Sequence, residues 1–335
     1  MEFTYFIGTD VSKNELDFAV MRGSELLFHR EIANIQEGIA GFMKELLKLP
    51  GFDLSRAVFC MEHTGIYNNH LLVYLHKKKA NIWLESAVQI KNSSGKLRGK
   101  NDKADAIRIA DYAYTQRDKV RLWTPKREVI QQLANLAAAR NRLIAAKKML
   151  KTPLQEHDSF STKKISKPSA AVCHHTLKAI DADLEKAEKA IDELIAKDPE
   201  LKRLFSLVCS VTGIGKVTAT QILITTNEFK DISNPKQYAC YAGVVTFVQE
   251  SGIFKGKGRV SPMANKKVKT LLHMSAIVAI QHNQDLKSYY ERKVNEQKKN
   301  KMSVINAVRN KLILRIFACV NHDSLYQNNY HKLLA

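Results

Sequence analysis

Residues Gly99 to Ala113 read GKNDKADAIRIADYA, and this stretch predicts a helix that carries two acids near its start. Asp102 and Asp105 are three residues apart, so their carboxylates lie on one face of that helix. Taken alone, the pair has an ordinary interpretation, with Asp102 as the N-cap and Asp105 as a first-turn acid stabilised by the helix dipole. A functional interpretation therefore depends on what the rest of the chain places beside this helix.

The sequence before this helix predicts a sheet. Three runs rich in β-branched and aromatic residues, separated by the short polar breaks SKN and RGS, predict antiparallel strands. Beyond them, stretches with helical spacing alternate with short apolar runs. We expect strands at residues 4–7, 15–20, 24–32, 56–62 and 80–86, and helices at 35–49 and 67–79. Hairpin strands followed by alternating strands and helices indicate a mixed α/β sheet covered on both faces.

Two further acids follow predicted strands. Asp10 ends the first strand in FIGTDVSK, and Glu62 ends another in FCMEHTG, where an unpartnered carboxylate would be costly to bury. With Asp102 and Asp105 they form a candidate set of four carboxylates. Oxygen ligands of this kind suit Mg²⁺, and two such ions can stabilise the attacking and leaving oxygens in phosphoryl transfer. The other acids of this half are interpreted as surface or salt-bridging residues: Asp17, Glu31, Glu85 and Asp111.

From about Arg127 the sequence becomes strongly helical. Residues 129–150 form one helical run, and a later run carries a heptad seam of apolar residues: Leu177, Ile180, Leu184, Ala187, Ile191 and Leu194. The polar stretch 156–169 between the two runs suits a turn. We expect two long helices in an antiparallel hairpin, a coiled-coil connection, with two ordinary helices of a globular core as the alternative. The predicted domains are residues 1–125, 126–200 and 201–335.

A glycine motif lies in the third predicted domain. Residues 204–223 read LFSLVCSVTGIGKVTATQIL, in which Gly213 and Gly215 separate two predicted helices and Lys216 begins the second. The pattern is typical of a helix-hairpin-helix, whose glycines let the backbone approach a phosphate beside the amides of a helix N-terminus. A plain turn between two helices has a similar sequence. Gly213, Gly215 and Lys216 are therefore candidate nucleic-acid-binding residues.

The charge of the chain points to a polyanionic partner. Its 335 residues include 53 Lys and Arg against 33 Asp and Glu, a formal net charge of +20. Such an excess favours nucleic acid, with a merely soluble basic surface as the alternative. The five cysteines are far apart and form no CxxC pair, which argues against a disulfide framework or a zinc knuckle. No run approaches the length of a membrane span and no export signal is expected, so we expect a cytoplasmic protein without a membrane partner.

The motifs GTDVSK (8–13), MEHTGIY (61–67) and NDKADAIRIADYA (101–113), in this order, closely resemble the N-terminal half of the DEDD-type insertion-sequence transposases. VTGIGKVTA (211–219) and YAGVVTFVQESG (241–252) resemble the second block of that family. The resemblance implies an RNase H-like N-terminal domain of the Holliday-junction-resolvase type, a coiled-coil connection and a mainly helical C-terminal transposase domain. It also implies that Mg²⁺ or Mn²⁺ is bound by four acids: Asp10, Glu62, Asp102 and Asp105.

The same resemblance implies a nucleophile, Ser251 in QESG. Judged from chemistry alone, Ser251 is a loop serine beside a glycine, in a segment that also supplies positive charge for phosphate oxygens. The basic candidates of this segment are Lys255, Lys257 and Arg259. Ser261 and Thr246 are rival hydroxyls, because spacing does not exclude them.

Members of the family are recombinases guided by a structured bridge RNA encoded beside their gene. The resemblance therefore implies a bacterial or archaeal protein, acting at the nucleoid with a guide RNA and with donor and target DNA, through a covalent 5′-phosphoserine linkage. We also expect a homodimer that becomes a tetramer on nucleic acid. Two alternatives stay open: a metal-only junction nuclease in which Ser251 is structural, and a non-catalytic nucleic-acid-binding protein.

Overall fold

The chain forms two compact units, residues 1–125 and 126–335, and each is described by itself. The structure, a computed structural model, describes residues 2–93, 101–248, 250–251, 254–256 and 258–328. Within these residues no helix combines the length and the apolar character that crossing a membrane requires. All five cysteines lie in the described residues, and all five are free thiols.

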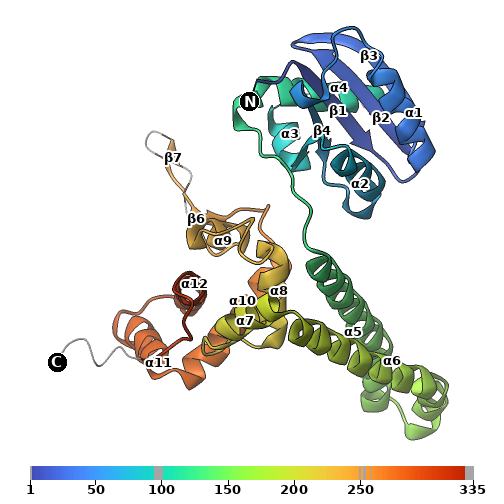
Figure 1. Ribbon diagram of the computed structural model, residues 1–335. Helices are drawn as coiled ribbons and strands as arrows, with labels where there is room; N and C mark the ends of the chain where they lie inside the picture. The colour runs from blue at the N-terminus through green and yellow to red at the C-terminus, as the bar shows by residue number, and fades with distance from the viewer. Residues whose placement is uncertain (1, 94–100, 249, 252–253, 257, 329–335) are drawn as a thin grey trace. The chain divides into compact units, whose positions relative to one another are not determined.

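The first unit is built on one mixed sheet of five strands (Figure 1). Its strands are β1 (Tyr5–Val11), β2 (Glu15–Arg22), β3 (Glu25–Ala33), β4 (Ala57–Glu62) and β5 (Asn81–Glu85). The order across the sheet is β3-β2-β1-β4-β5, with the first three strands antiparallel and β1, β4 and β5 parallel. β1 extends beyond the apolar run 4–7 and ends one residue after Asp10, its predicted last residue, because it pairs with β2 from Tyr5 to Val11.

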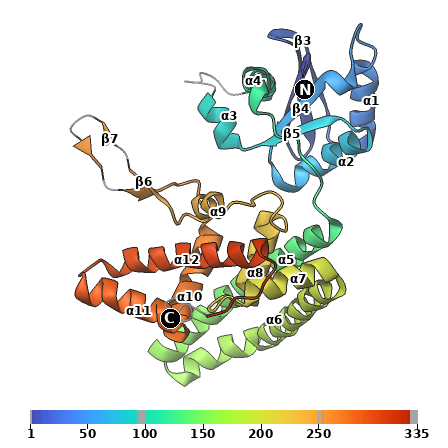
Figure 2. The same cartoon turned by 60° about the vertical axis from the view of Figure 1, so that its left-hand side comes forward.

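Helices cover both faces of this sheet, as Figure 2 shows with the strands nearly edge-on. The helices are α1 (Gln36–Leu46), α2 (Asn69–Lys77), α3 (Ala87–Ser93) and α4 (Asp102–Thr115), with short 3₁₀ turns at Leu54–Arg56, Gly65–Asn68 and Arg117–Lys119. On one face, α1 and α2 bury apolar side chains against Ile7, Phe18 and Phe59. On the other face, α3 and α4 pack against Phe6 and Cys60. Each face therefore has its own apolar core.

The contact between α4 and β1 is unusually close at Gly8. A Cβ atom placed on Gly8 would lie 2.2 Å from the carbonyl oxygen of Ala106 and 2.2 Å from the backbone nitrogen of Ala110. No side chain fits there, so glycine is required by the approach of the helix and not by its backbone angles. The small residues at positions 106 and 110 complete the contact, because both are buried against the strand.

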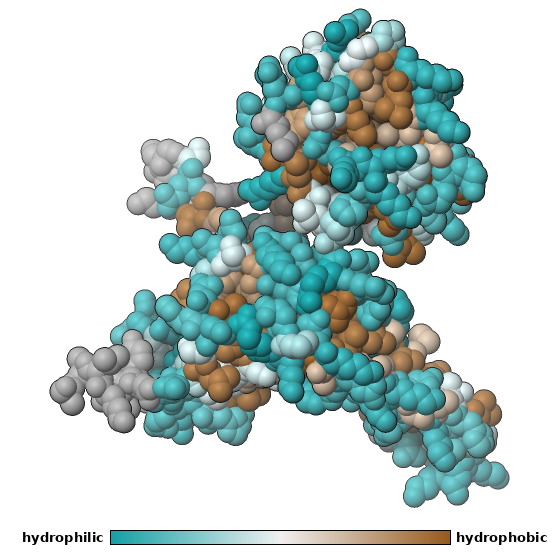
Figure 3. Space-filling view, in the orientation of Figure 1, coloured by the Kyte–Doolittle hydropathy of each residue, from teal (hydrophilic) through white to brown (hydrophobic). Residues whose placement is uncertain are grey.

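The second unit is mainly helical. Its helices are α5 (Glu128–Phe160), α6 (Lys163–Lys197), α7 (Pro199–Cys209), α8 (Lys216–Thr226), α9 (Pro235–Tyr241), α10 (Lys266–His282), α11 (Gln284–Glu291) and α12 (Lys301–Asn321), with a π-helical turn at Arg292–Glu296. A two-stranded ribbon that carries Ser251 has two short paired segments: β6 (Thr246–Phe247) pairs with β9 (Arg259–Val260) at its root. β7 (Glu250–Ser251) pairs with β8 (Phe254–Lys255), and both lie between β6 and β9 in the sequence. Hydrophilic residues predominate on the face of this unit seen in Figure 3. The predicted combination of a mixed α/β sheet with a mainly helical second part is confirmed.

Helices α5 and α6 pack along each other in opposite directions. Arg140 pairs with Glu188, and seven residues later Lys147 pairs with Asp181, which lies seven residues earlier. The seam residues of α6 are all half-buried or buried, whereas most residues between them are exposed. The connection is shorter than predicted: only Ser161 and Thr162 separate the helices, because both helices extend into the polar stretch, whose glutamate and three lysines are good helix formers.

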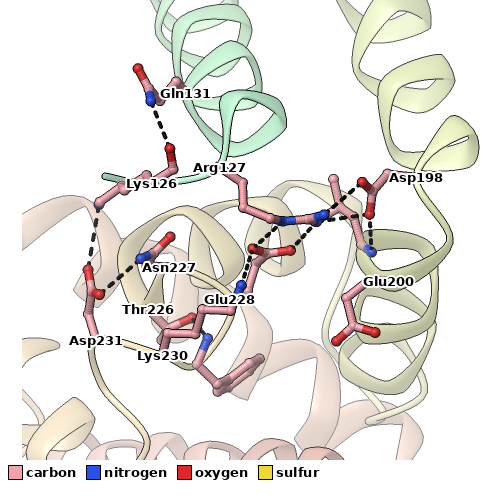
Figure 4. Close-up of polar contacts among 12 residues, drawn as sticks. Lys126, Arg127, Gln131, Asp198, Glu200, Thr226, Asn227, Glu228, Lys230 and Asp231 are labelled. Carbon is pink, nitrogen blue, oxygen red and sulfur yellow. Dashed lines mark hydrogen bonds and ion pairs between the residues drawn. The ribbon is translucent and has the colours of Figure 1, made fainter. Parts of the chain in front are cut away.

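Arg127 ties the start of α5 to two distant parts of the unit (Figure 4). Its guanidinium donates two hydrogen bonds to Asp198, at 2.9 and 3.0 Å, and two to Glu228, at 2.5 and 2.9 Å. Asp198 also accepts the backbone N–H of Leu201 and so caps α7. The guanidinium lowers the pKa of Asp198, with the Leu201 amide as a second cause. Glu228 is almost fully buried, so Arg127 supplies the countercharge that its burial requires.

Substitution of Gly8 tests the close packing of α4. Gly8→Ala is expected to lower the free energy of unfolding of the first unit by about 2–3 kcal/mol, because the added methyl group forces α4 away from the sheet. Both tryptophans, Trp83 and Trp123, lie in the first unit, so their fluorescence during denaturation reports that unit.

Gly41 provides a matched control, because a Cβ atom there meets nothing within 4 Å. Gly41→Ala lies inside α1 and should stabilise the unit by about 0.5–1 kcal/mol. An unchanged denaturation midpoint for Gly8→Ala would contradict the packing.

Candidate metal centre and candidate nucleophile

Three of the four candidate acids come together at the end of β1. Asp10 is the second-last residue of β1, and Asp102 and Asp105 lie in the first turn of α4. Oxygen atoms of these three carboxylates lie within 4.8 Å of one another. Side chains alternate along a strand, so Asp10 leaves the sheet on the same face as Gly8, the face that α4 covers. The packing at Gly8 therefore brings the start of α4 over Asp10.

The start of α4 is capped by Asn101 and not by either aspartate. The side chain of Asn101 accepts the backbone N–H of Ala104 at 2.7 Å. Asp102 is the first helical residue and is exposed, whereas Asp105 is half-buried and forms an ion pair with Arg108. The interpretation of Asp102 as the N-cap is therefore wrong, because an asparagine one residue earlier fills that role.

Glu62 ends β4, the parallel neighbour of β1. The β1–β4 register runs to Thr9 opposite Met61, so Asp10 and Glu62 are the next residues on the two strands. Glu62 follows Val58 and Cys60 at intervals of two, which places it on the face that α4 covers. Among the described residues it is not one of the three whose oxygens lie within 4.8 Å. The structure therefore brings three acids together and places the fourth on the adjacent strand.

The acidic cluster changes the ionisation of Asp10. Burial raises the pKa of the Asp10 carboxyl, and the negative charges of Asp105 and Asp102 raise it further. Asp17, opposite Asp10 on β2, adds a smaller effect of the same sign, although it is itself paired with His29 at 2.7 Å. A cation held between these carboxylates would relieve their mutual repulsion.

The interpretation of Glu85 as a surface or salt-bridging residue is wrong, because it is half-buried beside the site with a tyrosine as its hydrogen-bond partner. It ends β5 opposite Glu62, is half-buried, and accepts a hydrogen bond from the Tyr112 hydroxyl of α4 at 3.1 Å. Burial, followed by the charge of Glu85 and this hydrogen bond, raises the pKa of Tyr112. Three adjacent parallel strands thus each carry an acid as their last or second-last residue, a signal present in the sequence as Asp10, Glu62 and Glu85.

Ser251 lies on β7, in a narrow two-stranded ribbon of the second unit, and it is exposed. Its backbone is opposite Phe254 of β8. The rival hydroxyls differ from it: Thr246 is exposed on β6, whereas Ser261 is half-buried and accepts the backbone N–H of Met263 at 3.2 Å. Ser251 therefore has the exposure that a nucleophile needs, and Ser261 has a local structural role.

Two of the three basic candidates near Ser251 lie in the described residues. Lys255 is on β8, with its backbone opposite Glu250, and Arg259 is exposed on β9. Lys257 lies outside the described residues. Positive charge close to Ser251 in the sequence is therefore on the same ribbon as the serine.

The glycine motif forms the turn between α7 and α8. Gly213 has φ +92°, and a Cβ atom on it would lie 2.5 Å from the carbonyl oxygen of Ser275 on α10. Gly215 precedes α8 and has open space around its Cα, while Lys216 is exposed and pairs with Asp192 at 2.7 Å. Packing against α10 accounts for Gly213 without a ligand. Phosphate binding at Gly215 and Lys216 stays a prediction.

Comparison with known protein families identifies the chain. A transposase model of the DEDD IS110 type matches residues 7–157, and the model of the transposase IS116/IS110/IS902 family matches residues 205–291. The chain belongs to the IS110 family of DEDD transposases. The transposase is also 24% identical over 332 residues to the pilin gene-inverting protein of Moraxella bovis, and 23% identical to that of Moraxella lacunata. These alignments cover 98% of the transposase and 99% of each relative.

The acidic cluster of the transposase fits a divalent cation on chemical grounds. All three clustered groups are carboxylates, the oxygen ligands that Mg²⁺ and Mn²⁺ take. Asp10 is half-buried among like charges, which is an unfavourable arrangement without a cation.

Asp10→Asn tests this cluster by stability. Because the folded-state pKa of Asp10 is raised above 3.8, the folded state binds more protons, and wild-type stability falls as pH rises through that pKa. Without metal, Asp10→Asn should therefore gain stability over wild type as pH rises above about 4. Addition of Mg²⁺ should stabilise only the wild type, by about 2.7 kcal/mol at a hundredfold excess over Kd.

Tryptophan fluorescence follows both effects in the first unit. Asp111→Asn, an exposed acid on α4, should respond to Mg²⁺ like the wild type. Equal stabilisation of Asp10→Asn by Mg²⁺ would place the ion elsewhere.

Proposed function

We propose that this transposase is an RNA-guided DNA recombinase that exchanges strands through a covalent 5′-phosphoserine intermediate. The observation that carries the proposal is the cluster of Asp10, Asp102 and Asp105 in a chain that matches DEDD transposases. The sheet order, with three antiparallel strands followed by two parallel ones, supports the RNase H-like assignment. Residues 1–125, 126–200 and 201–335 are proposed as its resolvase-like, connecting and C-terminal domains.

In this proposal the acids bind the metal ion that stabilises the negative charge of the phosphate. Asp10, Glu62, Asp102 and Asp105 hold Mg²⁺ or Mn²⁺, which supplies Lewis-acid stabilisation of the phosphate oxygens. Ser251 supplies the nucleophile: its Oγ–P bond forms as the P–O3′ bond breaks, Oγ loses its proton, and the 3′ oxygen takes one up. Lys255, Lys257 and Arg259 contribute positive charge to the phosphate oxygens, and Gly213, Gly215 and Lys216 contact nucleic acid.

The relatives favour strand exchange over simple hydrolysis. Both are named pilin gene-inverting proteins, and inversion requires that cut DNA ends be rejoined. A phosphoserine linkage conserves the energy of the broken phosphodiester bond for that rejoining, whereas hydrolysis by activated water releases it. The alternative is a metal-only junction nuclease in which Ser251 is structural.

Covalent trapping separates the two reactions. The protein is incubated with its flanking noncoding RNA, Mg²⁺, and donor and target DNA, then denatured and examined for DNA-linked protein. Wild type should form an adduct and Ser251→Ala should form none, a loss of at least about a thousandfold, because the residue that bonds to phosphorus is absent. Ser261→Ala is the matched control and should retain the adduct.

Cleaved DNA without an adduct in any variant would support the metal-only nuclease. An adduct that survives in Ser251→Ala but not in Thr246→Val would move the nucleophile to Thr246. Omission of the RNA should abolish the adduct if sequence recognition is delegated to base pairing.

We further propose a homodimer that becomes a tetramer on nucleic acid. The heptad seam of α6 is covered by α5 of the same chain, so pairing of subunits requires another surface. The end of the hairpin exposes four large apolar side chains: Met149 at 72%, Phe160 at 89%, Ile165 at 64% and Val172 at 80%. Large apolar side chains that are exposed in the free chain favour association between protein surfaces.

Light scattering tests this pairing. Wild type should have the mass of a dimer alone and of a tetramer with RNA and two DNAs, while Phe160→Glu should be a monomer because a charge enters the contact. Leu314→Glu, which alters an exposed apolar residue on α12, should stay dimeric. A monomeric wild type on RNA and DNA would refute the assembly.

A further inference from the structure

A buried guanidinium in the second unit has no acidic partner among the described residues. Arg309 lies on α12 and is 5% exposed. Its Nη2 lies 2.5 Å from Nδ1 of His273 on α10, and its Nη1 donates to Oδ1 of Asn306 at 3.3 Å. Its Nε has no acceptor in the described part of the chain. Both of its hydrogen-bond partners are therefore uncharged when His273 accepts from it.

This arrangement is costly for the protein alone. A guanidinium stays protonated in proteins, and a buried charge without a counter-ion is among the least favourable features of a fold. Arg127 shows the usual solution in the same unit, with two carboxylates around one guanidinium. At Arg309 the described chain supplies positive charge but no negative charge to balance it.

The polar side chains that α10 places near Arg309 are hydrogen-bond donors. Because His273 accepts from Arg309 at Nδ1, its ring proton is on Nε2, which makes Nε2 a donor on the other side of the ring. His273 is half-buried on α10. Lys269 is half-buried one turn earlier, on the same helical face. An anion at this face would meet a histidine N–H and a lysine, with the Arg309 charge beneath them.

The same face adjoins the root of the ribbon that carries Ser251. Asn306, which accepts from Arg309, donates to the carbonyl oxygen of Val244 at 2.6 Å. A Cβ atom on Gly243 would lie 3.5 Å from Cδ of Lys269. Two residues after Val244 the chain enters β6, so α10, α12 and the root of the ribbon meet here (Figure 2).

We propose that Lys269, His273 and the underlying Arg309 form a binding site for a DNA backbone phosphate beside the root of the Ser251 ribbon. The phosphate supplies the negative charge that Arg309 lacks. DNA is favoured over RNA because the site adjoins the ribbon whose serine is proposed to attack DNA, and in this respect the inference rests on the proposed function. Its residues belong to neither the acidic cluster nor the glycine motif.

The test measures how DNA affinity depends on salt. Binding of the full chain to a fluorescein-labelled DNA duplex of random sequence is followed by anisotropy over a series of KCl concentrations. Each phosphate contact adds about one to the slope of log K against log salt. Arg309→Met and Lys269→Met should each reduce the slope by about one and the affinity by about tenfold. Lys269 is half-buried at the surface, so Lys269→Met keeps the test valid if Arg309→Met folds poorly.

Arg203→Met is the matched control. It removes the same charge from the same unit, but the Arg203 guanidinium is already paired with Glu200 and Asp323, so the salt slope should stay that of the wild type. The stability of Arg309→Met gives a second readout, and it should change in the opposite direction to the DNA affinity. Arg309→Met should unfold at the same or a higher denaturant concentration than wild type, because an uncompensated charge is removed.

Unchanged slopes in both Arg309→Met and Lys269→Met overturn the site. The same titration with single-stranded RNA separates the two nucleic acids, and a slope lost only with RNA overturns the assignment to DNA. A wild type that fails to bind DNA at low salt overturns the proposed function as well. The trapping experiment can yield no adduct in any variant while Arg309→Met and Lys269→Met still lower the salt slope. That result refutes only the serine mechanism.

Discussion

A Cβ atom on residue 8 would lie 2.2 Å from the carbonyl oxygen of Ala106, so α4 can pack on β1 only where that strand carries glycine. The candidate metal centre depends on this contact. Asp10 is two residues further along the strand, and Asp102 and Asp105 are on the first turn of the helix that the glycine admits. Rigid secondary structure on both sides therefore fixes the acids, which is how binding sites reach the geometry that a metal requires.

The acidic cluster and the Arg309 site share one physical design. Each places a charged group at a partly or fully buried position where the described chain supplies little opposite charge, and an ion of opposite sign would stabilise it. Burial and the neighbouring carboxylates raise the pKa of Asp10, and Arg309 has only the neutral groups of His273 and Asn306 as hydrogen-bond partners. By contrast, Arg127 with Asp198 and Glu228 is balanced within the chain. Charge is balanced within the chain at Arg127, whereas the unbalanced charge at Asp10 and Arg309 is the basis of the two proposed ligand sites.

The strands, three of the covering helices (α1, α2 and α4) and the seam of α6 were predictable because each leaves a local pattern of two or of three and four residues, whereas α3 was not predicted. The seam residues Leu177, Ile180 and Leu184 are half-buried as that pattern requires. Contacts between distant segments left no such pattern. Gly8 is a glycine whose role appears only when α4 is in place, and Gly213 fits packing on α10 as well as it fits a phosphate. The Asn101 cap was one residue from the expected position, because Asn and Asp are nearly equal as caps.

Ser251 and the acidic cluster differ in how firmly the fold holds them. The acids are on a five-stranded sheet and a helix packed against it, whereas Ser251 is exposed on a ribbon whose strand pairs are two residues long. Phosphoryl transfer needs its reacting atoms held to a fraction of an ångström, and a two-stranded ribbon is marginal by itself. Among the described residues the root of the ribbon is packed closely: a Cβ atom on Gly243 would meet Ala264 and Val260, and Asn306 donates to the carbonyl oxygen of Val244. A DNA phosphate bound beside that root would order the ribbon only when substrate is present. In the proposed mechanism, this coupling would leave Ser251 poorly positioned for attack until DNA is bound.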